Sequence, residues 1–306
     1  MLIEELTHDE LDRRLRERGV HLDTGAWTIH LRLRVPDLAR DIAEMYGAYP
    51  VAEPETIADA SLFMQRKRSW PFLNRARVNV CIDEQRDFDA VSGHAVYATF
   101  ESALNWSIAL SDVAPLLMHA AVLERDGSAL LLPGPSGTGK STLCAALACS
   151  GWRLFSDEVA IFRPDDLALA PNPRPVSLKN GAIDTIRRSF PSAHISRTIV
   201  GTAKGDIAYM RSPRAAIERS HEPALAGTIV QPIYHAGAAT SVRRLASIEA
   251  FRLLTDNAVN YTSMLQLGFD AITRMVDRCR CYALVYSRLD EAMDTVAALH
   301  RGDQPN

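Results

Sequence analysis

The pattern of apolar positions near the N-terminus predicts a helix followed by a strand. Thr7 and Glu10 have the spacing of a capping box, and the apolar positions after them predict a helix that ends at Gly19. Residues 26–35 then alternate strictly between apolar and polar side chains, which is typical of a half-buried strand. Such a strand is either an ordinary member of a sheet or an edge to which a peptide can add.

The rest of the first hundred residues predicts the other elements of a small α+β unit. A helix is expected over 37–46, and Gly47 supplies its C-terminal stop. A second alternating segment at 75–82 predicts another strand, and a helix over 99–111 is expected to lead out of the unit. The two halves of the chain differ in character beyond this helix, so a domain boundary is predicted near residue 112.

The second half begins with a pattern that predicts a β-hairpin ahead of a helix. Apolar residues fill 116–124 and 129–133, and the turn sequence Arg-Asp-Gly-Ser at 125–128 separates them. A helix rich in alanine and leucine is expected at 141–150, followed by a strand that starts at Arg153. The later segments predict paired strands at 228–234 and 240–245, helices at 182–189, 247–256, 264–278 and 288–299, and a strand at 281–286.

Composition and charge narrow the classes of protein that fit these patterns. The 306 residues are 47% apolar, enough for an N-terminal α+β domain at 1–112 and a second, catalytic domain at 113–306. Substrate recognition is one role that the N-terminal domain could have. The net charge of −3 gives no general attraction to nucleic acid or to anionic lipid, so neither is an expected partner. No segment has the pattern of a signal peptide or a membrane span, and five cysteines without zinc-site spacing fit a cytoplasmic protein.

The segment at 134–142, which follows the predicted hairpin, matches the Walker A pattern of a phosphate-binding P-loop. Its glycines allow several backbone N–H groups to turn toward one anion, and the helix that follows adds its positive end. The Lys140 side chain can reach the β- and γ-phosphates, and the Ser141 hydroxyl can ligate Mg²⁺. The predicted nucleotide-binding residues are Gly134, Pro135, Ser136, Gly137, Thr138, Gly139, Lys140, Ser141 and Thr142.

Two acidic residues, Asp157 and Glu158, follow the strand after the P-loop helix. Because a strand–helix–strand unit returns to the same edge of a sheet, we expect these acids to lie beside the P-loop. One carboxylate could hold Mg²⁺ through water, and the other could accept a proton from an attacking hydroxyl. Ser141, Asp157 and Glu158 are therefore the candidate metal ligands.

Other polar residues near these motifs have two interpretations each. His119 shares a face of the predicted hairpin strand with apolar residues, and spacing alone favours a histidine satisfied within the core. Arg174, Lys179 and Lys204 could steady phosphate charge or recognise a substrate, but without further information a surface cation is the simpler interpretation.

Three segments together resemble the C-terminal catalytic domain of HPr kinase/phosphorylase. They are residues 118–122, which contain the histidine, the loop at 134–142, and residues 155–159, which contain the two acids. Phosphoenolpyruvate carboxykinase shares the P-loop core of that family. The resemblance therefore implies an α/β fold with an HPr kinase/PEP-carboxykinase-like P-loop core of mixed sheet and flanking helices, plus the smaller N-terminal α+β domain.

A nearer resemblance, over almost the whole chain, is to the HPr-kinase-related kinases of type A. It is carried by Leu-Asn-Trp at 104–106, the phrase at 173–181 and Lys-Gly at 204–205. The resemblance implies that Asp157 is the catalytic acid/base, that Glu158 is the second acid, and that His119 assists Asp157. Lys140 completes the predicted catalytic set.

The sequence departs from true HPr kinases at several of these positions. Pro135 and Thr142 stand where the family usually has acidic residues, and the second acid is Glu158 rather than aspartate. The segment after the acids lacks the Arg-Gly-x-Gly signature expected for HPr recognition and phosphorolysis. These departures argue against HPr as the acceptor and against a reverse phosphorylase activity.

The leading hypothesis is a kinase that transfers the γ-phosphoryl group of ATP to a hydroxyl, with serine in a small protein or peptide as the expected acceptor. ATP and Mg²⁺ are the expected cofactors. GTP is an alternative to ATP, because the sequence has no visible motif that recognises the nucleotide base. The alternatives are a small-molecule kinase for an amino acid or polyol, favoured by a closed small pocket beside Asp157, and a nucleotide-dependent switch without phosphotransfer. True HPr kinases are hexamers, so the resemblance allows a homo-oligomer.

Overall fold

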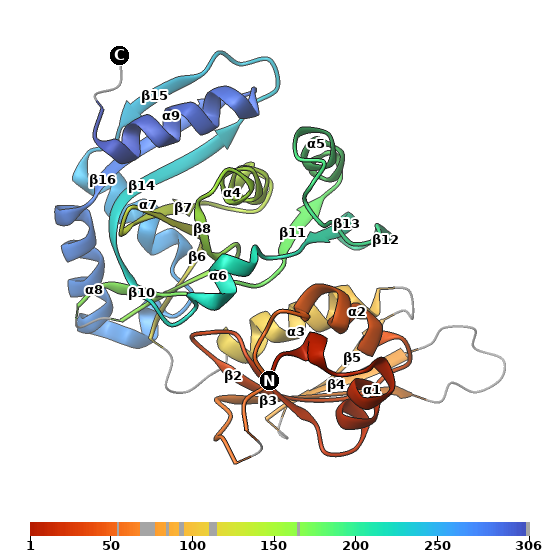
Figure 1. Cartoon of the computed structure of the whole chain (residues 1–306). Coiled ribbons are helices and arrows are strands. Elements are labelled where there is room, and N and C mark those ends of the chain that lie inside the picture. The colour runs from red at the N-terminus through yellow and green to blue at the C-terminus, as the bar shows by residue number, and fades with distance from the viewer. Residues whose placement is uncertain are drawn as a thin grey trace.

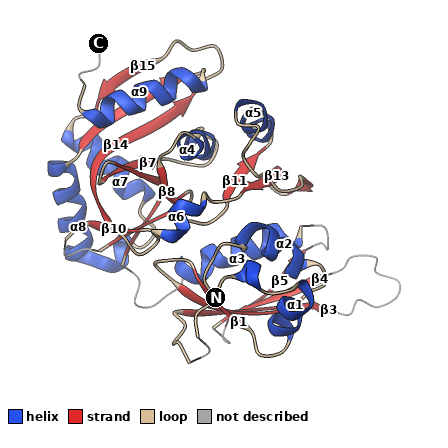
Figure 2. Cartoon of the chain, in the orientation of Figure 1, coloured by secondary structure: helices blue, strands red, loops and turns tan. Residues whose placement is uncertain are grey.

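The chain forms a mixed α/β protein built on three sheets (Figures 1 and 2). The computed structural model describes residues 1–53, 55–67, 77–83, 86–91, 95–109, 115–163 and 166–303. One sheet of five strands belongs to the N-terminal part, and sheets of eight and three strands belong to the rest. Within the described residues, no helix combines the length and the apolar character needed to cross a bilayer.

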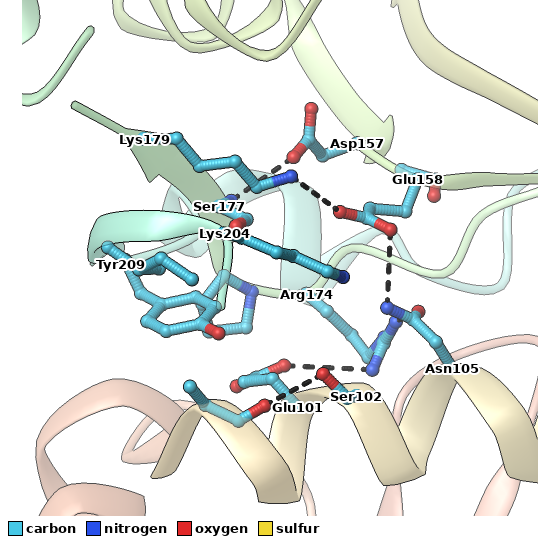
Figure 3. A pocket seen from close by; sticks show the side chains of 14 residues that line it. Glu101, Ser102, Asn105, Asp157, Glu158, Arg174, Ser177, Lys179, Lys204 and Tyr209 are labelled. Carbon is cyan, nitrogen blue, oxygen red and sulfur yellow. Dashed lines mark hydrogen bonds and ion pairs between the residues drawn. The ribbon is translucent and has the colours of Figure 1, made fainter. Parts of the chain in front are cut away.

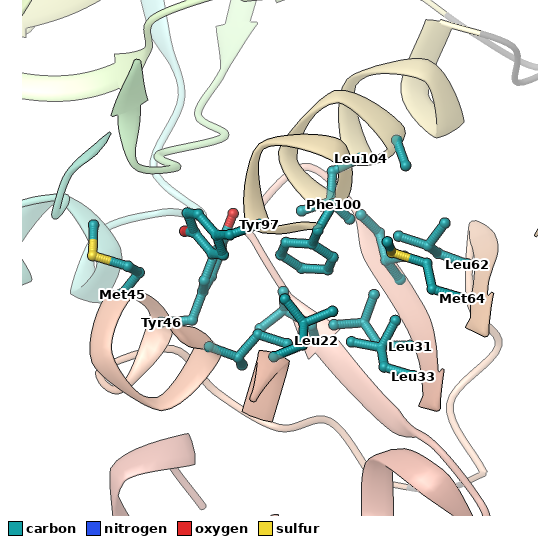
Figure 4. Packing of buried hydrophobic residues seen from close by; sticks show 14 of the residues in the cluster. Leu22, Leu31, Leu33, Met45, Tyr46, Leu62, Met64, Tyr97, Phe100 and Leu104 are labelled. Carbon is teal, nitrogen blue, oxygen red and sulfur yellow. The ribbon is translucent and has the colours of Figure 1, made fainter. Parts of the chain in front are cut away.

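The N-terminal sheet carries its helices on one face. Its strands, in spatial order, are β1 (Val20–Asp23), β2 (Thr28–Arg34), β3 (Ala60–Lys67), β4 (Arg77–Ile82) and β5 (Arg86–Val91). The helices are the short 3₁₀ turn η1 (Ile3–Glu5), α1 (His8–Arg16), α2 (Leu38–Tyr46) and α3 (Val96–Ala109). Figure 4 shows Phe100 of α3 packed over Leu31 and Leu33 of β2, so the alternating strand and the helices share one core.

Local signals account for the first helix and the first long strand. The Thr7 hydroxyl accepts a hydrogen bond from the Glu10 N–H at 3.3 Å, which confirms the predicted cap of α1. The alternation in β2 is confirmed, because Ile29, Leu31 and Leu33 are buried. Strand β2 pairs with both β1 and β3, so it is an ordinary member of the sheet, and the alternative of an edge for strand addition is wrong.

Two further N-terminal predictions need correction or fall outside the described residues. Gly47 ends α2 with a φ of −52°, not in the left-handed conformation of a usual glycine stop. A side chain there would instead meet the Ala43 carbonyl at 2.9 Å, so close packing explains this glycine. Helix α3 begins at Val96, earlier than expected, and the predicted boundary near residue 112 lies outside the described residues.

The large sheet has the order β10-β9-β6-β7-β14-β16-β15, and β8 also pairs with β6. These strands are β6 (Leu116–Arg125), β7 (Ser128–Pro133), β8 (Arg153–Ser156), β9 (Val159–Phe162), β10 (Ala168–Ala170), β14 (Ala224–Tyr234), β15 (Ser241–Arg244) and β16 (Arg280–Tyr286). Strands β6 and β7 form the predicted antiparallel hairpin, whereas β14 runs parallel to both β7 and β16. The sheet is therefore mixed, as predicted.

Helices cover both faces of the large sheet. Helices α4 (Lys140–Cys149) and α9 (Leu289–Arg301) pack on the face that includes Ala121 and Leu123 of β6. Helices α7 (Ser247–Asn257) and α8 (Tyr261–Arg278) pack on the opposite face, with Ala120 and Val122. Neighbouring positions of β6 therefore point into different cores, because successive side chains of a strand alternate between faces.

The predicted pairing of the segments at 228–234 and 240–245 is wrong. Strand β16 lies between them and pairs with β14 on one side and β15 on the other. Strand β16 is almost entirely buried and takes an interior position, whereas β15, with the sequence Ser-Val-Arg-Arg, is mostly exposed and takes the edge. Sequence neighbours are thus separated by an apolar strand from much further along the chain.

The smallest sheet joins the two halves of the molecule. It contains β11 (Val176–Lys179), β13 (Gly205–Met210) and β12 (Ile199–Thr202), in that order, with α5 (Gly181–Ser189) and α6 (Arg214–Glu218) nearby. Ile207 and Tyr209 of β13 belong to the same buried cluster as the N-terminal core. The Tyr49 hydroxyl also donates to the Pro173 carbonyl at 2.5 Å. These contacts hold the N-terminal helices against the segment that carries the candidate site.

Candidate functional site

The register of strand β6 brings the glycine-rich loop and the acidic pair together. Ala120 of β6 pairs with Pro133, the last residue of β7 before the loop. On the other edge of β6, Val122 pairs with Ser156 and His119 pairs with Val159. Strands β8 and β9 thus run along the same edge of β6, and Asp157 and Glu158 interrupt them level with the loop. The acids therefore lie beside the loop, as expected, but β6 lies between β7 and β8.

The loop at 134–139 turns tightly between β7 and α4. Gly137 and Gly139 have φ values of 90° and 93°, which are strained for residues with side chains. A Cβ at Gly139 would also lie 2.2 Å from the Tyr286 hydroxyl oxygen. Helix α4 begins at Lys140, so the first-turn N–H groups near Ser141 and Thr142 have no partner within the helix. Such a helix start is suited to an anion.

Lys140 lies buried beneath the loop and contacts His119. Its ammonium donates to the Gly134 carbonyl at 2.6 Å and to the Pro135 carbonyl at 3.1 Å, and its Nζ lies 3.2 Å from His119 Nε2. His119 Nδ1 lies 3.1 Å from the Glu158 carbonyl. The Lys140 ammonium can only donate a hydrogen bond, and the Glu158 carbonyl can only accept one. The two contacts therefore fit a neutral imidazole that carries its proton on Nδ1. Burial and the Lys140 charge lower the pKa of His119, in agreement with that form.

Asp157 is a buried carboxyl with one oxygen left unpaired. Its Oδ2 accepts the Ser177 N–H at 3.1 Å, whereas the buried Oδ1 has no hydrogen-bond partner among the described residues. Burial and, after it, the nearby Glu158 charge raise the pKa of Asp157 to about 7, while the Ser141 hydroxyl and the Ser177 N–H oppose the rise. Asp157 can therefore exchange a proton near neutral pH.

Glu158 links the two halves of the molecule. One carboxylate oxygen lies 4.0 Å from Lys179 Nζ at the end of β11, and the other accepts a weak hydrogen bond of 3.5 Å from the Asn105 amide of helix α3 (Figure 3). Asn105 also accepts a hydrogen bond from Arg174 through its Oδ1. Because the arginine can only donate, this contact determines the orientation of the amide.

Arg174 and Glu101 form a buried pair behind Asn105. Their nearest nitrogen and oxygen are 3.7 Å apart, beyond hydrogen-bond distance, and each side chain is more than nine-tenths buried. The other oxygen of Glu101 accepts the hydroxyls of Tyr46 at 2.9 Å and Tyr97 at 2.6 Å. Nε and Nη1 of Arg174 have no hydrogen-bond partner among the described residues. A buried donor left unpaired in this way costs about 1–3 kcal/mol.

Two adjoining cavities meet at the acidic pair. The larger has a volume of about 800 Å³ and extends from Asp157 along the loop and α4 to Tyr234 and Tyr286. The smaller, of about 50 Å³, lies between α3 and the small sheet, on the other side of Asp157. Asp157, Glu158, Ser177, Lys179 and Lys204 line both cavities.

Most of the residues singled out from the sequence line one of these cavities. His119, Ser136, Gly137, Gly139, Lys140, Ser141 and Thr142 line the larger one, and Arg174 lines the smaller one. Gly134, Pro135 and Thr138 shape the loop, where the Thr138 hydroxyl donates to the Pro135 carbonyl at 3.0 Å. Sequence reasoning missed the roles of Glu101, Asn105, Ser177 and Tyr286. Ser177 and Asn105 both occur in the sequence phrases that carry the family resemblance, and this was the available signal.

The residues near Asp157 fit a cation that is shared with a ligand, not a cage made by protein alone. The unpaired Asp157 Oδ1, the Glu158 carboxylate and the Ser141 hydroxyl supply oxygen donors beside the loop. Within the described part of the chain, no group of three or more His, Cys, Asp or Glu side chains could hold a metal ion. Mg²⁺ commonly uses one or two carboxylates and completes its shell with water and substrate phosphates, so this donor set suits it.

Comparison with known proteins gives limited matches. Residues 103–171 match the family model of the SynChlorMet cassette protein ScmC, a segment that holds Asn105, His119, the glycine-rich loop and both acids. No curated protein matches the chain. Among solved structures, the chain is similar to the Hpr(Ser) kinase/phosphatase from Coxiella burnetii, with 15% identity over 60% of this chain and 90% of that chain. The TM-score of 0.27 is too low to establish a shared fold.

Proposed function

We propose that the protein is an ATP- and Mg²⁺-dependent kinase that transfers the γ-phosphoryl group to a hydroxyl. The observation that carries the proposal is the position of Asp157. Its carboxyl, with a pKa of about 7, lies beside the start of α4 and the glycine-rich loop, at the junction of the two cavities. A general base is most effective when its pKa is near the working pH. The Walker A pattern and the resemblance to HPr-kinase-related kinases support the same reaction.

In the proposed reaction, the acceptor oxygen bonds to the γ-phosphorus as the bond from that phosphorus to the β–γ bridging oxygen breaks. The acceptor proton moves to Asp157, and the electron pair leaves with ADP. The Lys140 ammonium and the N–H groups at the start of α4 stabilise the phosphate charge. His119 accepts a hydrogen bond from Lys140 and holds the ammonium near the loop.

Ser141, Asp157 and Glu158 are the residues that would hold Mg²⁺. When bound, the ion would neutralise charge on the phosphate oxygens. The chain contributes the orientation of these donors: Ser177 fixes Asp157, and Asn105 and Lys179 fix Glu158. The larger cavity is roomy enough for a nucleotide, since ligand pockets commonly measure about 300–1,000 Å³.

A serine in a small protein or peptide was the acceptor expected from the sequence. The second candidate is a small hydroxyl compound, such as an amino acid or polyol. The specific observation in its favour is the small cavity of about 50 Å³ beside Asp157, which α3 lines on one side. A cavity of this kind suits a small molecule or the end of a chain better than the middle of an extended peptide.

The proposed function is tested by incubating the full chain with γ-labelled ATP, Mg²⁺ and candidate hydroxyl acceptors, and identifying the labelled product by mass spectrometry. Phosphate on an acceptor hydroxyl is the expected result. ATP binding or slow hydrolysis without any labelled acceptor would contradict the kinase proposal and would favour a nucleotide-dependent switch. The same assay with labelled GTP determines which nucleotide is used.

The pH dependence of transfer should follow the ionisation of Asp157. Because the carboxylate is the form that accepts the proton, kcat should rise about tenfold per pH unit below a midpoint near 7 and level off above it. Single-turnover rates between pH 5 and 9 measure this profile, with a nucleotide-binding titration over the same range as the control. A rate that is flat from pH 5 to 7 would rule out Asp157 as the base.

A further inference from the structure

The small cavity beside Asp157 combines residues from both halves of the chain. Helix α3 lines it with Glu101, Ser102 and Asn105, while β11 and β13 contribute the opposite wall (Figure 3). Asp157 lines this cavity as well as the nucleotide-sized one. A group bound here would therefore lie within a few bonds of a hydroxyl positioned at Asp157.

The size of the cavity limits what it can hold. Its volume is about 50 Å³, which is room for a few water molecules, since about 10–15 Å³ of such volume holds one. A group of about three heavy atoms therefore fits without rearrangement. A carboxylate has this size, whereas a peptide continuing in both directions does not. The remainder of such an acceptor would extend into the larger cavity.

Three cations line the cavity, and they balance its three acids when Asp157 is ionised. Arg174 is more than nine-tenths buried, and two of its guanidinium nitrogens have no hydrogen-bond partner among the described residues. Lys179 and Lys204 extend into the same space in Figure 3. Within the described part of the chain, Lys204 forms no ion pair.

The acids of the same cavity already have their own partners. Glu101 accepts hydrogen bonds from two tyrosine hydroxyls, and Glu158 is shared between Lys179 and Asn105. The Arg174–Glu101 separation of 3.7 Å is too long for a hydrogen bond, so this ion pair does not satisfy the guanidinium. Nε and Nη1 of Arg174 are covered by neighbouring atoms, so a carboxylate in the cavity would reach these unpaired donors after a small shift of the guanidinium.

We propose that this cavity, the end pocket, binds the carboxylate of the acceptor against Arg174. The acceptor class is then a compound whose hydroxyl lies two or three bonds from a carboxylate. Two sources have this chemistry: a free hydroxy acid or hydroxy amino acid, and the C-terminal serine or threonine of a peptide. In either case α3 forms part of the acceptor site, which gives the N-terminal half a direct role in specificity. The inference rests on the proposed phosphotransferase activity.

The test measures phosphoryl transfer by the unaltered protein to each acid and to its matched amide. L-serine is compared with L-serinamide, and Gly-Gly-Ser as the free acid with its C-terminal amide, in the presence of ATP and Mg²⁺. We expect kcat/KM to be at least about tenfold higher for the acid of a pair, since hydrogen bonds to charged groups are the stronger ones. Whether the free amino acid or the tripeptide is preferred distinguishes the two sources.

Variants connect the preference to Arg174. Arg174→Lys keeps the positive charge but removes the planar guanidinium, and should lower kcat/KM for the acids about tenfold or more while changing that for the amides little. Arg163→Lys alters an exposed arginine that pairs with Asp166 and should leave both values unchanged. Thermal unfolding of each variant checks that the fold is retained.

Each outcome bears directly on the inference. A preference for acids that disappears in Arg174→Lys supports the end pocket. Equal transfer to acids and amides by the unaltered protein overturns the end pocket and leaves the kinase proposal standing, and this result does not depend on any variant folding. Absence of transfer to every compound, with ATP binding intact, overturns the acceptor assignment and the kinase proposal together.

Discussion

Replacement of Lys140 by alanine is expected to abolish phosphoryl transfer, with a loss of at least about 10³-fold in kcat. Removing one preorganised donor from a site of developing charge commonly costs a factor of about 10²–10³, and a full positive charge should cost more than a neutral donor. The ammonium is buried and donates to the Gly134 and Pro135 carbonyls of the loop. Among the described residues, no other cation occupies this position.

The measurement is single-turnover transfer from γ-labelled ATP, with nucleotide affinity determined separately. Lys140→Arg is the informative companion, because it keeps the charge but cannot fit the same buried contacts and should restore little activity. Arg163→Ala, on the surface, serves as the control for any general effect of losing a cation. Near-normal transfer by Lys140→Ala would remove the loop from the proposed mechanism.

Asp157→Asn should lower kcat by about 10²–10⁴-fold, the contribution usual for a general base. Asparagine has nearly the same shape, and its amide oxygen can still accept the Ser177 N–H, so the local structure should persist. The variant should retain ATP binding but lose the rise of kcat with pH. Asp166→Asn, at an exposed carboxyl, is the matched control and should behave like the unaltered protein. Transfer that survives in Asp157→Asn would show that another group accepts the proton.

The same substitution should stabilise the folded protein. The pKa of Asp157 is about 7 in the folded state and has an ordinary value of 3.8, so between these pH values the folded chain holds a proton that the unfolded chain has released. The free energy of unfolding contributed by this group therefore falls as pH rises from about 4 to 7. Asparagine avoids this loss, and at pH 8 the variant should be more stable by roughly 1–4 kcal/mol. Denaturant titrations at pH 5 and 8, without Mg²⁺ or nucleotide, measure the difference.

Much of the candidate site could be predicted because its signals are local. The hairpin, the loop and the acids all lie between residues 116 and 158, and short-range patterns determine each of them. The expected closeness of Asp157 to the loop was correct, although the reason was incomplete. Strands β7 and β8 are not neighbours, since both pair with β6 between them.

The rest could not be predicted because it depends on contacts between distant segments. Asn105 meets Glu158 across 53 positions, and Glu101 meets Tyr46 across 55. Glu101 has no pattern that indicates a site, because the other residues of its helix are mostly apolar. Asn105 lies in the phrase at 104–106 that carries the resemblance, but nothing in that phrase indicates a contact with Glu158. The pairing of the segments at 228–234 and 240–245 failed for the same reason, because a strand from beyond residue 279 lies between them.

The sequence by itself determined the parts of this protein that short-range physics controls. Spacing alone indicates the glycines that turn the backbone at 134–139 and the helix that starts after them. It also indicates the two acids that follow the next strand. Only the tertiary structure decided the environment of those groups. Burial raises the pKa of Asp157 to about 7, and the packing of α3 against the small sheet forms the small cavity beside it. This burial and this cavity arise from residues far apart in the chain, so no local pattern could specify them.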